Sequence, residues 1–352
     1  MMTTNWKKGI ALLLAVLLLG MSLAACRGND GGDDGDVMIR VEGGRPVLWD
    51  ELYYDIQIVR HNLEMWGPIA DWDAMFHHNP LGEEMTYREF ILLSAIDTAM
   101  NRRAIEALFS ESGETLDENA AAEVRAGYLE EFEMDEEEFA ELLEQNYLTE
   151  EVFRYATEVR LMADLLVEVL FGVDGADITS ADIAAVESEA DILRAKHILI
   201  QVPAEEDDPE ATEQIWAIYE QLSGLTGDAL AVRFDELIDT YGEDPGMLAN
   251  PDGYTFVPGV MVPEFTEGAQ ALEMGTISEP IRAFHGYHII LRLPVQEDAI
   301  VMMQGGMQMP FRQLAITTLL DLRLEERRAE MDYTLTQALM DFNLDTILIS
   351  EE

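Results

Sequence analysis

Between about residues 49 and 189, apolar side chains recur at helical spacing and acidic residues fill most positions between them. This spacing predicts a series of helices, each with one apolar stripe that faces a core. Three residues at expected helix starts have side chains that can cap free backbone N–H groups: Asp135, Thr149 and Thr179. Gly172 is the expected end of the helix that follows Thr149. Weak alternation at 37–41 predicts a short strand before these helices.

The pattern changes between residues 191 and 294, where strand-like and helical stretches are mixed. Strand-like runs lie at 192–202, 277–282 and 287–293, with an extended piece at 254–256. Helical stretches lie at 209–222, 228–241 and 263–274. This order predicts an α+β domain, in which helices cover a small and mostly antiparallel sheet.

After residue 294 the pattern becomes irregular before it turns helical again. Four methionines surround Gly305 and Gly306 within residues 295–309, and this stretch is predicted to be a linker. A long helix is expected from Pro310 to about Phe342, followed by a short strand at 344–349. Because the helix has apolar residues on its faces, we expect it to pack on the helical segment at 37–190.

The first 26 residues have the pattern of an export signal. Lys7 and Lys8 precede ten apolar residues, which is short for a membrane span of about 20. The sequence Leu-Ala-Ala-Cys that ends at Cys26 resembles the lipobox of bacterial lipoproteins, and this resemblance implies cleavage before Cys26 and its acylation. The alternatives are an ordinary signal peptide and an uncleaved anchor. Residues 27–36 are small or charged and predict a flexible tether.

Composition narrows the range of partners. The chain of 352 residues has a formal charge of −49, which becomes −51 for side chains once Lys7 and Lys8 leave with the signal. Such a charge argues against nucleic-acid binding and mainly indicates a solvated acidic surface, with cation binding as a weaker alternative. Cys26 is the single cysteine, so no disulfide can form within the chain.

Two histidines stand out in the mixed segment. His197 lies in the first predicted strand and His288 lies in the last one. Because strand side chains alternate between faces, both histidines can project from the same face of one sheet. Histidines in strands are usually structural, and this pattern by itself does not separate a structural pair from a catalytic one.

The order of short motifs around these histidines resembles the parvulin family of peptidyl-prolyl cis/trans isomerases. The resemblance is carried by five segments in the family's order: 195–199, 241–246, 256–265, 272–280 and 284–290. It covers about a hundred residues and places the domain at 191–294. The sequence departs from the family pattern at Gly242, where serine is common, and at 252–255, which reads Asp-Gly-Tyr-Thr.

The resemblance implies a role for each matching residue. His197 and His288 match the paired histidines, Asp244 matches the acid beside the reacting peptide bond, and these three are the expected catalytic residues. The expected substrate-binding residues are Phe256, Met261, Phe265 and His285. The alternatives are a plain core for the apolar side chains, a turn acid for Asp244 and a structural pair for the histidines. Rotation about an X-Pro bond breaks no bond, so no cofactor or metal is expected.

The whole chain resembles the PrsA-type foldase lipoproteins, in which helical terminal segments flank one parvulin domain. This implies a lipid-anchored enzyme and chaperone at the outer face of the membrane, acting on unfolded or nascent secreted proteins. Four acids in the loop at 203–208 argue against phosphopeptides as substrates. The alternative is a chaperone or scaffold whose parvulin domain catalyses little. A second copy of the chain is a further expected partner, bound through the helical segments. Nucleic acid is not an expected partner.

Overall fold

The computed structural model describes residues 36–348, except for residues 66, 78, 80–83 and 204–207. The chain divides into two compact units, Asp174–Leu319 and the residues on either side of it, Met1–Val173 with Leu320–Glu352. The division falls at the 3₁₀ turn η4 (Val173–Gly175) and within helix α11 (Phe311–Ala329). The predicted signal, Cys26 and the predicted tether at 27–35 lie outside the described residues.

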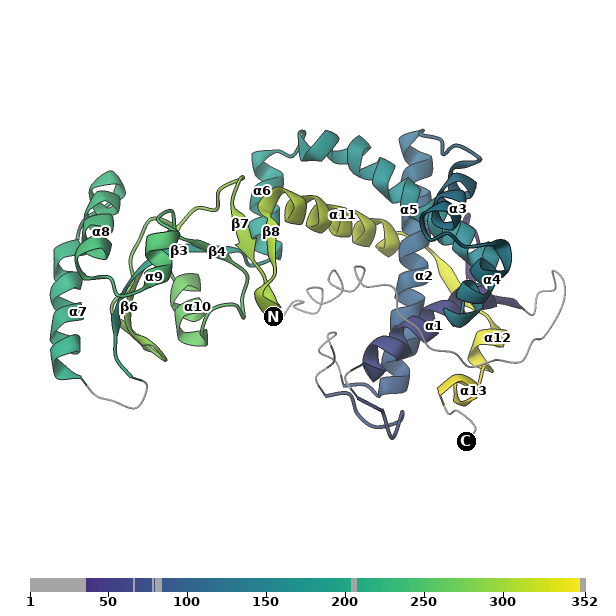
Figure 1. Ribbon diagram of the computed structural model, residues 1–352, viewed down its shortest axis with the longest axis horizontal. Coiled ribbons are helices and arrows are strands. Elements are labelled where there is room, and N and C mark those ends of the chain that lie inside the picture. Colours follow the sequence, from purple (N-terminus) through teal and green to yellow (C-terminus); the bar gives the residue numbers. More distant parts are fainter. Residues whose placement is uncertain (1–35, 66, 78, 80–83, 204–207, 349–352) are drawn as a thin grey trace. The chain divides into compact units, whose positions relative to one another are not determined.

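One sheet forms the centre of the 174–319 unit (Figure 1). Within the described residues it has six strands in the order β5-β6-β3-β4-β7-β8. The strands are β3 (Leu193–Gln201), β4 (Tyr254–Phe256), β5 (Ile281–Ala283), β6 (Gly286–Leu293), β7 (Ile300–Met302) and β8 (Gln308–Pro310). The pairings are antiparallel except for β4 with β7, which is parallel. The predicted α+β domain is therefore confirmed.

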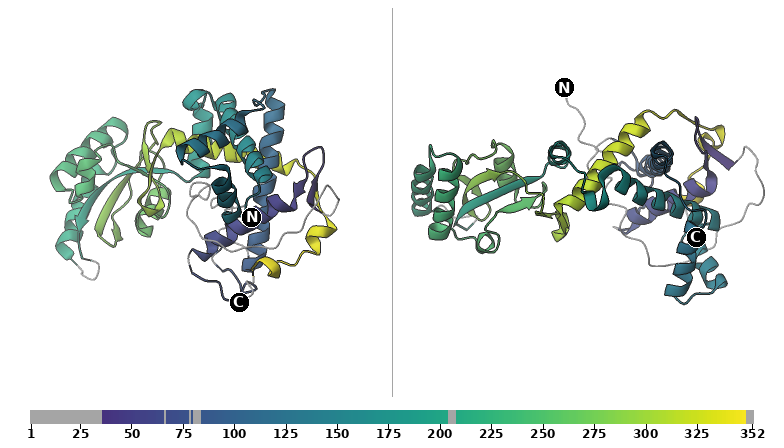
Figure 2. Two further views of the ribbon diagram at one scale, coloured as in Figure 1. Left: turned by 45° about the vertical axis from the view of Figure 1, so that its right-hand side comes forward. Right: turned by 90° about the horizontal axis from the view of Figure 1, so that it is seen from above.

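Helices cover both faces of this sheet, as the strand alternation requires (Figures 1 and 2). They are α7 (Pro209–Leu222), α8 (Gly227–Tyr241), α9 (Pro245–Ala249) and α10 (Pro263–Gln270), and α6 (Ser180–Glu189) precedes the first strand. On one face, Ile198 and Ile200 of β3 pack with apolar residues of α7 and α8. On the other face, Leu193 and Ala195 pack with Phe265 and other residues of α10. His197 belongs to this second face, because it is an even number of residues from Ala195.

The linker expected at 295–309 is wrong from residue 300 onward, because residues 300–310 form a β-hairpin. Strands β7 and β8 enclose a 3₁₀ turn, η5 (Gln304–Gly306), and β7 pairs with β4 at Thr255↔Val301 and Phe256↔Met302. Val301 is fully buried. The run Ile-Val-Met followed by Gly-Gly is a hairpin signal that the methionine-rich composition obscured. On the opposite edge, the strand expected at 277–282 is reduced to an isolated bridge at Ile277 and to β5.

Helices dominate the second unit, which contains both terminal segments of the described chain. They are α1 (Trp49–Glu64), α2 (Tyr87–Ser112), α3 (Ala120–Glu131), α4 (Glu136–Gln145), α5 (Glu150–Phe171), α12 (Gln337–Met340) and α13 (Asp345–Leu348), together with the end of α11. The capping predictions are confirmed: Asp135 and Thr179 form capping boxes with Glu138 and Asp182, and Thr149 caps α5. The predicted helix end is also confirmed, because α5 ends at Phe171 and Gly172 is its C-cap residue.

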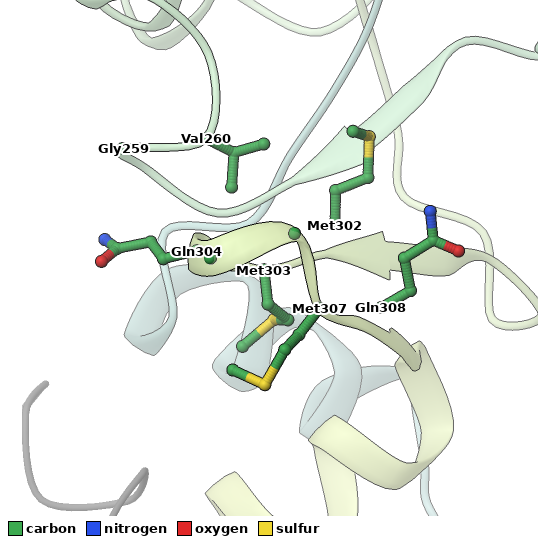
Figure 3. Close-up of a pocket in the computed structure, with 9 residues that line it drawn as sticks. Gly259, Val260, Met302, Met303, Gln304, Met307 and Gln308 are labelled. Atoms are coloured by element: carbon green, nitrogen blue, oxygen red, sulfur yellow. The ribbon is translucent and has the colours of Figure 1, made fainter.

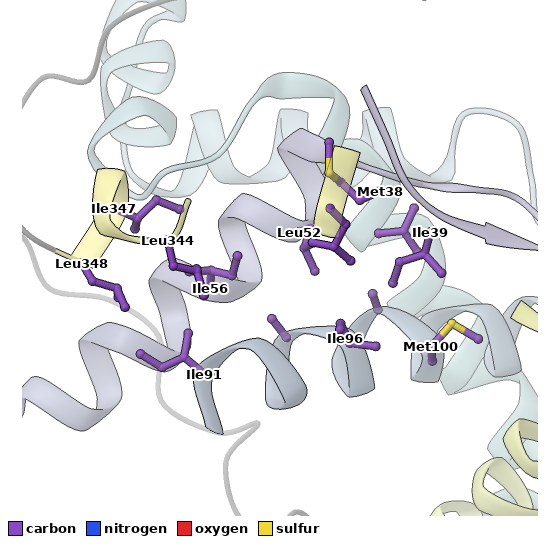
Figure 4. Packing of buried hydrophobic residues seen from close by; sticks show 14 of the residues in the cluster. Met38, Ile39, Leu52, Ile56, Ile91, Ile96, Met100, Leu344, Ile347 and Leu348 are labelled. Atoms are coloured by element: carbon purple, nitrogen blue, oxygen red, sulfur yellow. The ribbon is translucent and has the colours of Figure 1, made fainter. Parts of the chain in front are cut away.

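Two predictions for the C-terminal part are wrong. The helix expected to reach Phe342 ends at Ala329, and β9 (Tyr333–Leu335) follows it. This strand joins β1 (Val37–Val41) and β2 (Val47–Leu48) in the order β2-β1-β9, so the described sheet brings the terminal segments together. The strand expected at 344–349 is the helix α13 over its described residues. Leu344, Ile347 and Leu348 have helical spacing and pack on the core with Ile56 and Ile91 (Figure 4).

A buried ionic network lies between α1, α2 and α5. The guanidinium of Arg103, whose side chain is 1% exposed, donates to both carboxylate oxygens of Glu51 at 2.9 and 2.6 Å. Arg102 donates to Glu51 at 2.8 Å and pairs with Asp55. Tyr155 of α5 also contacts Arg103. Each charge has an opposite partner, which offsets part of the cost of removing these groups from water, although burial still raises the pKa of Asp55 to about 6.

Candidate active site

The two histidines predicted from strand alternation meet on the α10 face of the sheet. In the register of β3 with β6, His197 lies opposite Ile290 and His288 lies opposite Leu199, so the histidines are diagonal neighbours. Their Nδ1 atoms are 3.2 Å apart. His197 is 8% exposed and His288 is 3% exposed. Water therefore reaches little of either ring, and the hydrogen bonds that the rings make are with protein groups.

Asp244 is held beside His197 by the chain segment that leaves α8. The backbone N–H of Glu243 donates to the carbonyl of Leu199 at 3.0 Å, and the Glu243 carboxylate accepts from the N–H of Gln201 at 2.6 Å. These bonds occupy the part of the β3 edge that β4 leaves free. They bring an oxygen of the Asp244 carboxylate to 2.7 Å from Nε2 of His197.

The Asp244 carboxylate has two further donors. Its Oδ1 accepts from the backbone N–H of Gly246 at 2.9 Å, which caps α9, and its Oδ2 accepts from the hydroxyl of Tyr254 at 2.8 Å. A Cβ atom at Gly246 would lie 1.9 Å from the Tyr254 hydroxyl, so this contact requires glycine. Hydrogen bonds from His197, Gly246 and Tyr254 hold the pKa of Asp244 far below its ordinary value. Burial and the Asp244 carboxylate raise the pKa of Tyr254, which keeps its hydroxyl a donor.

The direction of the hydrogen bonds along the three side chains depends on which nitrogen of each ring carries a proton. With one proton on each ring, the ionised Asp244 accepts from Nε2 of His197, and Nδ1 of His197 is left as an acceptor. His288 then donates its Nδ1 proton to His197 and carries a bare Nε2. This Nε2 is buried and has no hydrogen-bond partner among the described residues. Burial is the main cause that lowers the pKa of His288 to about 3, so its ring is neutral near pH 7.

Apolar side chains lie next to the hydrogen-bonded side chains of Asp244, His197 and His288. The ring of Phe265 is 5.2 Å from the His197 ring and 5.6 Å from the His288 ring, between centroids and nearly edge-on. Phe256 is fully buried beneath Phe265, with ring centroids 5.9 Å apart. Met261 packs on the same cluster and is partly buried. The site thus places oriented hydrogen-bonding groups beside apolar side chains.

His285 is the expected site residue that lies apart from this group. It is exposed in the turn between β5 and β6, and its ring stands edge-on to Phe284 at 5.1 Å. Its carbonyl accepts from the N–H of Val202 at 3.1 Å. Sequence reasoning missed Tyr254, whose only signal was that it replaces the residue usual in the family pattern. Among the described residues no cluster of three or more potential metal ligands occurs.

Replacing Tyr254 with phenylalanine is expected to lower kcat for X-Pro isomerisation about tenfold, because one hydrogen bond to a charged group contributes about 1.5–3 kcal/mol. The pKa of Asp244 is expected to rise, since one of its donors is lost. Carboxyl-carbon NMR of labelled aspartate measures the pKa directly. An unchanged Asp244 pKa together with unchanged kcat would show that Tyr254 only fills space.

Acid is expected to weaken the 174–319 unit through His288. Because the pKa of His288 is lower in the folded state than in the unfolded state, its contribution to stability is complete above pH ~6.5. It is lost as the pH falls toward 3, with a slope of at most about 1.4 kcal/mol per pH unit. Urea unfolding at pH 7 and pH 4.5 measures this loss in the native protein. The His288→Gln variant should lose less stability over the same interval, and equal losses would contradict the assigned neutral His288.

Comparison with known proteins places this site in a family. Residues 197–293 match the model described as Rotamase, the PPIC-type PPIase domain. The foldase protein PrsA of Caldanaerobacter subterraneus is 28% identical over 286 residues, which are 81% of this chain and 82% of that protein. The chaperone SurA of Pseudoalteromonas atlantica is 35% identical over 99 residues, which are 28% of this chain and 22% of that protein.

A solved structure gives a weaker comparison. The crystal structure of PrsA from Bacillus cereus is 17% identical, covers 80% of this chain and 100% of that chain, and has a TM-score of 0.30. The assignment of the family therefore depends on the sequence matches and not on superposition. The chain carries a parvulin-type peptidyl-prolyl isomerase domain and is a homologue of the PrsA foldases.

Proposed function

We propose that this protein is a foldase that accelerates rotation about X-Pro bonds in unfolded secreted proteins. The observation that carries the proposal is the hydrogen-bonded line from Asp244 through His197 to His288, placed against the ring of Phe265. It joins polar groups of fixed direction to an apolar surface within one face of the sheet. The sequence relationship to foldases and chaperones agrees with such a role.

The reaction explains why these residue types are sufficient. Amide resonance sets a barrier of ~18–20 kcal/mol, and uncatalysed X-Pro exchange takes tens to hundreds of seconds. No covalent bond forms or breaks, so the site needs only to bind the twisted amide more tightly than the planar one. Each tenfold gain in rate requires about 1.4 kcal/mol of such preference.

We assign the roles accordingly. Phe265 and Met261 hold the prolyl ring, and the buried Phe256 supports Phe265 from below. Asp244 and His197 present a charge and a fixed dipole beside the rotating bond, and His288 fixes the ring of His197. His285 contacts the client outside this group, from its exposed turn.

The remaining roles belong to the flanking segments. We propose that residues 37–190 and the C-terminal helices form a chaperone-like module. The isomerase domain lies at about 191–294, and the hairpin at 300–310 belongs to this domain. Cys26 carries the lipid that holds the protein at the extracytoplasmic face. None of the described helices combines the length and apolar character needed to cross a membrane. Sedimentation of the purified chain tests for the homodimer that the helical segments suggest.

Refolding of a secreted protein limited by proline isomerisation tests the proposal. The full chain, at a tenth of the substrate concentration, should raise the rate of the slow phase at least several-fold, as followed by tryptophan fluorescence. Suppressed aggregation with an unchanged slow phase would overturn the catalytic role. That result would favour a chaperone whose parvulin domain binds clients without isomerising them.

A further inference from the structure

A hollow of about 200 Å³ lies between the loop after β4 and the hairpin formed by β7 and β8 (Figure 3). Gly259 and Val260 line it from the loop, and Met302, Met303 and Met307 line it from the hairpin, with Gln304 and Gln308 beside them. No residue that lines the hollow is charged, although the chain has 70 acidic residues. The lining therefore suits an apolar group and not a cation.

Contacts within the unit hold the hollow open. The side-chain amide of Gln304 donates to the carbonyl of Pro258 at 2.9 Å and so ties the hairpin to the loop. Gly259 has a φ of +86°, and a Cβ there would lie 2.7 Å from the Gln304 amide nitrogen. The backbone N–H of Met303 donates to the carbonyl of Met307 at 2.8 Å and closes the hairpin. A ligand would therefore meet a preformed wall, which reduces the cost of ordering on binding.

The hollow adjoins the apolar cluster that lies under the candidate active site. Val260 and Met302 line the hollow, and both also pack on the cluster that contains Phe256 and Phe265. Met261 follows Val260 in the chain and packs on the same cluster. A peptide whose prolyl ring rests on Phe265 therefore has a second apolar recess adjoining the same cluster.

Size and side-chain chemistry indicate what the recess accepts. An apolar cavity of about 150 Å³ is large enough to bind benzene, so this hollow can hold one leucine, methionine or phenylalanine side chain. Methionine side chains are flexible and polarisable, and they adapt to partners of different shape. Met307 is 52% exposed, which leaves its thioether free to move over an entering group.

We propose that this hollow is a specificity subsite, which takes one large apolar side chain of the same client chain whose proline occupies the active site. The inference extends the proposed function and rests on it. It assigns substrate preference to a hairpin outside the 197–293 region that matches the isomerase family. Because the subsite does not touch the rotating bond, it binds the planar and twisted amides equally and acts on KM and not on kcat.

The test uses the full chain and a set of unphosphorylated peptides with a central proline flanked by alanines on both sides. Each peptide carries one leucine at a different position, up to about four residues before or after the proline. We expect one position to lower KM about fivefold at unchanged kcat, which is a modest effect for an apolar side chain in a partly open recess. The Met307→Glu variant should abolish this preference. The matched control Met274→Glu, at a methionine that is 54% exposed and does not line the hollow, should keep it.

The outcomes separate the subsite from the isomerase activity. Isomerisation without preference for leucine at any position overturns the subsite and leaves the proposed function intact. If the native protein does not isomerise any peptide, fluorescence anisotropy with labelled peptides decides: a leucine preference in Kd that Met307→Glu removes supports the subsite. A change of oligomeric state in Met307→Glu with an unchanged preference assigns the hollow to a second copy of the chain and overturns the inference.

Discussion

Replacement of Asp244 by alanine is expected to lower kcat/KM for an X-Pro peptide about a hundredfold. The carboxylate accepts hydrogen bonds from His197, Gly246 and Tyr254 and carries the charge of the site. Hydrogen bonds to a charged group contribute about 1.5–3 kcal/mol, and 2.7 kcal/mol corresponds to about a hundredfold in rate. Loss of the carboxylate also frees His197 to rotate or change tautomer. A protease-coupled assay with a chromogenic X-Pro peptide measures the effect.

Two further variants separate charge from packing at this position. Asp244→Asn keeps the shape and removes the charge, and we expect it to lose most of the activity as well. Asp235→Ala removes an acid from the same unit, where Asp235 pairs with Lys196 on the surface at 2.7 Å. This control should stay within twofold of the native protein. A fully active Asp244→Asn would show that the charge contributes nothing to catalysis.

The largest expected effect on stability comes from Glu51→Ala in the helical unit. The variant leaves Arg103 buried without its main counter-ion, because both of its bonds to Glu51 are lost. Removing one partner of a buried ion pair costs about 3–5 kcal/mol. Urea unfolding followed by circular dichroism should show this loss in the transition of the helical unit. Isomerisation of short peptides should persist, because the 174–319 unit has its own cores.

Surface and paired replacements provide the controls. Glu136→Ala breaks an exposed pair with Arg125 and should cost less than about 1 kcal/mol. In the double variant Glu51→Leu with Arg103→Met, the uncompensated charge is absent, so much of the lost stability should return. A Glu51→Ala variant as stable as the Glu136→Ala control would contradict the structural importance of the network.

Features that depend on neighbouring residues in the chain were predictable from the sequence. The capping boxes at Asp135 and Thr179 involve side chains three residues apart, so their spacing is visible directly. The meeting of His197 with His288 follows from strand alternation and from the pairing of two strands with helices between them. The position of Asp244 came from family resemblance, because no local rule places residue 244 beside residue 197.

Features that depend on tertiary contacts were not predictable in the same way. The bond from Tyr254 to Asp244 requires a particular path of the chain after α9, which the sequence does not reveal. The hairpin at 300–310 is stabilised by pairing with β4, some 45 residues earlier. In α13 the apolar spacing of Leu344, Ile347 and Leu348 fits a helix, but so short an apolar run does not separate a helix from a strand by spacing alone.

Exchange NMR on an unphosphorylated X-Pro peptide tests the catalytic role of the site most directly, because it observes the cis and trans forms at equilibrium without a coupled enzyme. Substoichiometric native protein should produce exchange cross-peaks between the two forms, and the same amount of Asp244→Ala should not. The cis fraction should stay the same in both samples, since a catalyst leaves the equilibrium unchanged. Equal exchange in both samples would contradict the assigned site, and no exchange with the folded native protein would contradict the isomerase function.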